Sequence, residues 1–293
     1  MQIVGDTAAN VFPGQMAGLP VHLVPLTFTL DGATYKSGVD VDAAGFYRMI
    51  TATSGYPVTS QPPVGAFVET YRRLAASDPE ILSIHVDSVL SGTYNSAVAA
   101  AQLVPEAHVT HYDSKTLSSP LAWLLEAAAR AAQAGWSVQH ILDMLARIGQ
   151  ATSVVFTVSD LDYLVHSGRI SHLKGLLARV LKIKPLIGID TTSVVVYPDG
   201  QARTMRRALE AMVSFVGKQQ APGSTRRMQV LYGAHPEMAE SLRSLLTAQF
   251  DCRWLPSGAL APVLGAHTGP GVVAAFYAPA AVFDEVPGQI WQG

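Results

Sequence analysis

Side chains with hydroxyl groups gather in three loops in the first half of this 293-residue chain. The loops are Thr59-Ser60-Gln61-Pro62, Ser88-Val89-Leu90-Ser91-Gly92-Thr93 and Asp113-Ser114-Lys115-Thr116-Leu117-Ser118-Ser119. Such loops, placed between strands and helices of a parallel sheet, lie at its carboxyl edge, where helix N-termini direct free N–H groups. Hydroxyls and amides there could hold an anion without a lysine or arginine. For any single loop, however, helix capping is the commoner role of a Ser or Thr.

A cluster rich in glycine lies near the end of the chain, at Gly265-Ala266-His267-Thr268-Gly269-Pro270-Gly271, just before an apolar strand predicted at 272–277. Three glycines and a proline in seven residues predict a shaped loop. His267 could donate a hydrogen bond to a carboxylate with or without a charge. A structural histidine bonded to backbone fits the spacing equally well.

The common sequence motifs of catalytic and nucleotide-binding sites are absent from this sequence or incomplete. The spacing Gly269-x-Gly271-x-x-Ala274 matches a dinucleotide fingerprint formally, but too few residues follow it to complete a βαβ unit. The sequence has no Gly-x-Ser-x-Gly elbow and no Walker motif. Its single cysteine, Cys252, excludes an internal disulfide and a cysteine-rich metal site. We therefore expect no catalytic residue, no metal and no cofactor.

The pattern of apolar residues predicts an α/β protein with two domains. In the first half, short apolar runs alternate with helical patterns, which is typical of a parallel sheet flanked by helices. The expected strands are 23–28, 81–86 and 108–112, and the expected helices are 64–75, 94–104, 121–134 and one capped by Ser137.

The second half has a different pattern. Strands are predicted at 154–158, 184–189 and 193–197, with a helix over 176–181, and the turn Pro198-Asp199-Gly200 favours a hairpin. The second sheet should therefore be mixed. We place the boundary between an N-terminal domain, 1–151, and a C-terminal domain, 152–293.

Composition limits the class of partner. The chain is 49% hydrophobic and 14% charged, with a formal net charge of −2. It can thus build a large core and still line an apolar pocket, whereas a nucleic-acid partner would call for a basic excess. Residues 1–6 lack the features of a signal peptide, and Glu126 and Arg130 interrupt the most apolar helix, 121–134. We expect a cytoplasmic protein without stable membrane insertion.

Taken together, six motifs in order resemble the DegV family of fatty-acid-binding proteins over nearly the whole chain. They are Val58-Thr59-Ser60-Gln61-Pro62, Leu90-Ser91-Gly92-Thr93-Tyr94, Asp113-Ser114-Lys115-Thr116, Ser167-Gly168-Arg169-Ile170-Ser171, Ala202-Arg203-Thr204 and His267-Thr268-Gly269-Pro270-Gly271. The start, Ile3-Val4-Gly5-Asp6-Thr7, is similar to the family's opening. Gly5, Thr7 and Pro63 depart from the Thr, Ser and Ser that are usual there.

This resemblance implies a fatty acid, similar to palmitate, buried between two α/β domains. Thr59 and Ser91 would bind its carboxylate, with Ser60, Gly92, Thr93 and His267 nearby. The protein would present the acid to a separate fatty-acid kinase, which makes acyl-phosphate for phospholipid synthesis. Arg203 matches a basic position that we associate with this transfer.

Two other hypotheses remain open. One is an enzyme, either a phosphotransferase or an acyl hydrolase, that uses Ser91, His267 and Asp113 within hydrogen-bond reach of one another. The other is a protein-interaction module, which would carry no lipid after purification.

Overall fold

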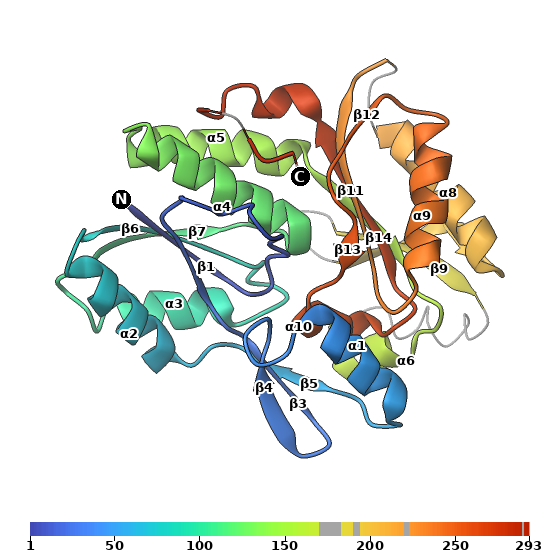
Figure 1. Cartoon of the computed structure of the whole chain (residues 1–293), viewed down its shortest axis with the longest axis horizontal. Coiled ribbons are helices and arrows are strands. Elements are labelled where there is room, and N and C mark those ends of the chain that lie inside the picture. The colour runs from blue at the N-terminus through green and yellow to red at the C-terminus, as the bar shows by residue number, and fades with distance from the viewer. Residues whose placement is uncertain (170–182, 190–193, 220–222, 289, 293) are drawn as a thin grey trace.

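The computed structural model describes residues 1–169, 183–189, 194–219, 223–288 and 290–292. Its elements follow one another along the chain as a mixture of strands and helices (Figure 1). The strands are β1 Gln2–Asp6, β2 Val21–Val24, β3 Thr27–Leu30, β4 Ala33–Lys36, β5 Val58–Ser60, β6 Glu80–His85, β7 His108–Asp113, β8 Ser153–Thr157, β9 Lys184–Ile189, β10 Val194–Ala202, β11 Arg226–Tyr232, β12 Cys252–Trp254, β13 Gly258–Ala259 and β14 Val273–Pro279. The helices are α1 Ala43–Ala52, α2 Val64–Ala75, α3 Thr93–Ala101, α4 Ser118–Gln133, α5 Val138–Ala151, α6 Asp162–Ser167, α8 Met205–Gln219, α9 Pro236–Thr247 and α10 Pro262–Thr268, with a 3-10 turn, η2, at Ala280–Phe283.

The first sheet has the order β2-β1-β6-β7, and every pairing in it is parallel, as predicted. Helices α2 and α3 cover one face and α4 and α5 the other (Figure 1). Helix α4 is apolar nearly all round and is correspondingly buried. Its one buried acid, Glu126, accepts a hydrogen bond from Arg130 Nε at 2.9 Å, which explains why this charge is tolerated inside.

The second sheet is mixed, which confirms the expected α/β class with two different sheets. Its order is β10-β9-β8-β14-β11-β12, and β13 also pairs with β11. Helices α8 and α9 pack on its outer face (Figure 1). On the inner face, side chains such as Phe156 and Phe276 join the core that contains α4. The two sheets therefore share one core rather than two separate ones.

A small antiparallel sheet, β4-β3-β5, was not expected. The predicted strand over 23–28 is in fact two strands, because Pro25 cannot donate to a ladder and the next N–H, of Leu26, bonds to Thr7 Oγ1 at 3.0 Å. Strand β5 carries Thr59 and belongs to this third sheet. Thr59 thus reaches its position from outside the parallel sheet.

Two further predictions about the second half are corrected. Strands β9 and β10 do pair as an antiparallel hairpin, but residues 198–200 lie within β10, where the register shifts between Tyr197 and Ala202. This register shift accommodates the residues within the strand, and no turn forms there. Second, most of the predicted loop 265–271 is the end of helix α10, so His267 lies on a helix. The helix predicted over 176–181 falls outside the described residues.

Candidate functional site

A cavity of about 530 Å³ lies between the two sheets and is lined from both halves of the chain. The first half contributes the end of β5, the loops after β5 and β6, and residues Ala8, Leu26 and Leu117. The second half contributes the inner faces of β8 and β14, the end of β9, and helix α10. Such a volume is within the usual range for a small-molecule site. Among the expected site residues, Thr59, Ser60, Ser91, Gly92 and His267 all line it.

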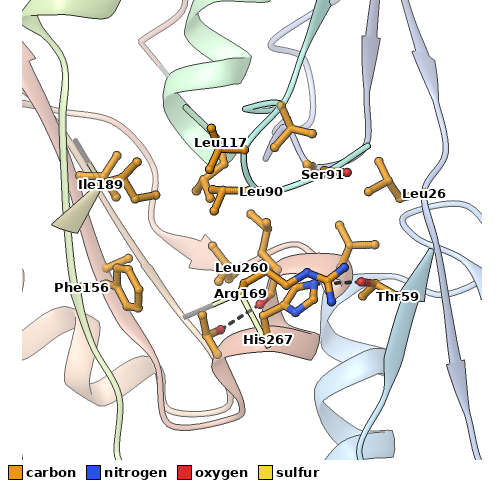
Figure 2. A pocket seen from close by; sticks show the side chains of 18 of the residues that line it. Leu26, Thr59, Leu90, Ser91, Leu117, Phe156, Arg169, Ile189, Leu260 and His267 are labelled. Carbon is orange, nitrogen blue, oxygen red and sulfur yellow. Dashed lines mark hydrogen bonds between the residues drawn. The ribbon is translucent and has the colours of Figure 1, made fainter. Parts of the chain in front are cut away.

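The polar groups gather on one side of the cavity. Figure 2 shows Thr59, Arg169 and His267 together on one side and Phe156 and Ile189 on the other. The rest of the lining is largely aliphatic. The cavity therefore has a polar end and an apolar body, as an amphiphile with one head group requires.

His267 is uncharged at neutral pH and orients Thr59. Its Nε2 lies 2.9 Å from Thr59 Oγ1. Burial, assisted by the nearby charge of Arg169, lowers the pKa of His267 to about 3. Nδ1 is buried and finds no partner among the described residues, and a buried orphan N–H is rarer than a buried lone pair. The proton is thus best placed on Nε2, which donates to Thr59 and leaves the Thr59 hydroxyl proton free for a ligand.

Arg169 is a lining residue that we did not predict as part of the site. It follows Gly168, whose positive φ of 71° ends helix α6, and its Nη1 donates to the Ser167 carbonyl at 2.7 Å. A cation is therefore present at the polar end, contrary to the expectation that uncharged donors alone would be found there. The motif Ser167-Gly168-Arg169 contained the signal, but nothing in the spacing showed which way Arg169 points.

Ser91 lines the cavity, and Thr93 lies behind it. Ser91 Oγ is 2.8 Å from Thr93 Oγ1 and accepts the Thr93 backbone N–H at 3.3 Å. Thr93 is fully buried at the start of α3 and is not among the cavity's lining residues in the described part of the chain. Ser91 thus accepts the N–H of the first residue of α3 and also faces the cavity, whereas Gly92 at the N-cap position has no side chain that could cap the helix.

Gly92 leaves room for the Gln61 side chain, whose amide end lies where a Cβ would be. A Cβ at Gly92 would lie 2.0 Å from Gln61 Oε1. Gln61 in turn donates from Nε2 to Ser96 Oγ at 3.0 Å. The two hydroxyl loops that line the cavity are therefore packed directly against each other.

Comparison with known proteins identifies this arrangement. The DegV family model, described as an uncharacterised protein of the DegV family, matches residues 1–280. The chain belongs to the DegV family. A DegV domain-containing protein of Halalkalibacterium halodurans is 32% identical over 272 residues, which cover 92% of this chain and 95% of that protein.

Two solved DegV structures share the fold over nearly their whole length. A DegV family protein from Thermus thermophilus, described by its fatty-acid binding, has a TM-score of 0.86 at 27% identity and covers 95% of this chain and 99% of its own. DegV of Bacillus subtilis, described as a fatty acid binding protein, has a TM-score of 0.84 at 26% identity and covers 94% of this chain and 98% of its own. Both bind the class of ligand that a cavity with one polar end would suit.

Asp6, at the DegV-like start of the chain, fixes two segments of the cavity wall. It is fully buried and accepts the N–H groups of Ala8 and Val86, each at 2.9 Å. Ala8 and Val86 both line the cavity. His85 Nδ1, 3.0 Å away, completes its partners. Gly5, which departs from the usual Thr, leaves room for Leu125, whose Cδ atoms would lie 2.7 Å from a Cβ.

The remaining predicted residues lie elsewhere. Arg203 is exposed between β10 and α8, and it is not among the cavity's lining residues in the described part of the chain. The set of side chains that the enzyme hypothesis requires is divided: Ser91 pairs with Thr93, His267 with Thr59, and Asp113 with Ser88 and Lys115. No cluster of three possible metal ligands occurs among the described residues. In the same part of the chain, no helix has the length and hydropathy needed to cross a membrane.

Proposed function

We propose that this DegV protein binds one long-chain fatty acid in the cavity, with its carboxylate at Thr59, Ser91 and Arg169 and its tail along the inner face of the second sheet. The observation that carries the proposal is a cavity that has hydroxyls and a guanidinium at one end and aliphatic side chains in its body. The fatty-acid binding of the Thermus and Bacillus relatives supports it.

The two ends of the ligand have different roles. A sixteen-carbon acid has about 14 methylenes, and burial at about 0.8 kcal/mol each contributes on the order of 11 kcal/mol before the costs of binding. The tail therefore dominates affinity. The head fixes orientation, because a carboxylate left without partners in this cavity would have to take up a proton or stay in water.

Arg169 and the hydroxyls act together on the carboxylate. The guanidinium provides charge, whereas the hydroxyls of Thr59 and Ser91 provide directed hydrogen bonds to the ionised form. Ser60 and Gly92 shape the wall beside them. We also propose that residues 1–151 and 152–293 form two domains and that the ligand is held between them.

We further propose that the bound acid is presented to a separate kinase, which phosphorylates the carboxylate, and that the protein itself does not catalyse this step. The family resemblance supports this role, and Arg203, exposed at the start of α8, is its candidate contact. Pure protein incubated with ATP and palmitate should form no acyl-phosphate. Product formed without a second protein would favour the enzyme hypothesis instead.

Mass spectrometry of the purified protein tests the ligand class. We expect a fatty acid to appear in the native spectrum and in an organic extract. Titration of delipidated protein with palmitate should then show one site, and Ser91→Ala should weaken binding more than Ser118→Ala, whose side chain is fully buried away from the cavity lining. Equal losses from the two variants would contradict the assignment of the head group.

A further inference from the structure

A second cavity, of about 430 Å³, adjoins the first and shares two lining residues with it, Val154 and Ile189. Its other lining residues include Thr116, Gln150, Tyr197 and Phe215. The Tyr197 and Phe215 rings, with centroids 4.3 Å apart, give it an aromatic surface. It thus offers an aromatic patch, set among polar side chains such as Ser114 and Gln219, beyond the end of the fatty-acid cavity.

The two shared residues form one rung of the second sheet. Val154 on β8 is the direct partner of Ile189 on β9 in an antiparallel ladder, so their side chains lie next to each other on the same face. The next rung on this face is Phe156 with Ile187. Val155, between them, points to the opposite face and joins the core under α8 and α9.

Residues from the first half divide the space at the same place. Thr116 lines the second cavity, whereas Leu117, the next residue, lines the first. Figure 2 shows Ile189 on the side of the cavity away from Thr59 and His267. The wall therefore lies where the methyl end of a bound acyl chain would arrive.

We propose that Val154 and Ile189 form the stop at the end of the acyl site and set the longest fatty acid that the protein accepts. This inference rests on the proposed function. When the two side chains are shortened, the cavities join, and the methyl end of a longer saturated chain extends toward Phe215. The residues at the polar end are not involved, so they continue to hold the carboxylate.

Affinities for a series of saturated fatty acids, from twelve to twenty-two carbons, test the proposal on delipidated full-length protein. Each added methylene should strengthen binding about fourfold, which corresponds to about 0.8 kcal/mol, until the tail meets the stop. In wild-type protein the affinity should then level off or fall. In the double variant Val154→Ala/Ile189→Ala, the increase should continue for at least two more carbons, which raises the preference for long over short chains by about tenfold or more.

Ile187→Ala is the matched control, because Ile187 lies on the same strand and is fully buried but is not among the residues that line either cavity. It should lower stability and leave the chain-length profile unchanged. If the double variant does not fold, Ile189→Val and Ile189→Phe serve instead, with the break expected at longer and shorter chains respectively. Wild-type protein that binds no fatty acid of any length overturns the proposed function and this inference together. If wild-type protein and all folded Ile189 variants bind fatty acids normally and their affinity stops rising at the same chain length, the inference alone is overturned.

Discussion

At the scale of single residues, we expect the hydroxyl of Thr59 to bind the fatty-acid carboxylate directly. Thr59→Val keeps the shape and removes the donor, while His267 Nε2 loses its partner 2.9 Å away. Since a hydrogen bond to a charged group contributes about 1.5–3 kcal/mol, palmitate should bind roughly 10 to 100 times more weakly. Thr59→Ser retains the hydroxyl and should bind within a few-fold of wild-type protein. Titration calorimetry that finds Val and Ser equivalent would remove Thr59 from the head-group site.

His267 makes the stability of the ligand-free protein depend on pH. Its pKa is lowered by burial and by Arg169 to about 3 in the folded state, against about 6.5 when unfolded. Between these values the unfolded chain binds more protons, so stability is fully present above pH 6.5 and declines as pH falls, by at most about 1.4 kcal/mol per pH unit from this residue. The free energy of unfolding, measured in urea at pH 7.5 and at pH 5.0, should decline less between these pH values in His267→Gln than in wild-type protein. Some decline should persist, because burial also lowers the pKa of His111, to about 4. The same decline in both proteins would refute the role of His267.

At the scale of elements, the contact between the Ser91 loop and the β5 loop controls the cavity wall. Gly92→Ala places a Cβ on the Gln61 side chain, which must move and give up its bond to Ser96. Because Gln61 lines the cavity, we expect weaker palmitate binding with little loss of stability. The double variant Gln61→Ala/Gly92→Ala removes the atoms that clash and should recover affinity relative to Gly92→Ala. Failure of this rescue, in titrations of both variants, would show that Gly92 acts in another way.

Helices and strands with a clear periodicity of apolar residues were predictable from the sequence, whereas elements that depend on partners far away in the chain were not. Helix α4 and strands β6 and β7 follow from local apolar patterns, and the hydroxyl loops contain Thr59 and Ser91, which both line the cavity. The third sheet was missed because β5 has only three residues and pairs with β3, about 30 residues earlier. Arg169 was missed for a similar reason, since its place in the cavity wall depends on a tertiary arrangement that joins residues far apart in sequence. The residue types of the site were readable, but the direction of each side chain was set by the fold.

At the scale of the whole molecule, Asn10 joins the two halves at the cavity. Its Oδ1 accepts the Ala261 N–H at 2.6 Å, and its Nδ2 donates to the Ala259 carbonyl at 3.3 Å, just before the helix that carries His267. Because the core also contains residues of both halves, such as Leu121 and Phe276, they should unfold together. We therefore expect one transition in urea, seen alike by tryptophan fluorescence and circular dichroism.

Asn10→Ala should lower the free energy of unfolding by about 1–3 kcal/mol, since it leaves the Ala261 N–H without its partner. It should also weaken palmitate binding, because α10 loses an anchor beside the cavity. Asn95→Ala, at an exposed position in α3, is the matched control and should change stability by less than about 0.5 kcal/mol. If Asn10→Ala instead behaves like this control, Asn10 is not the main link between the halves. If wild-type protein unfolds in two separate steps, the halves are held independently, and the ligand must provide their main link.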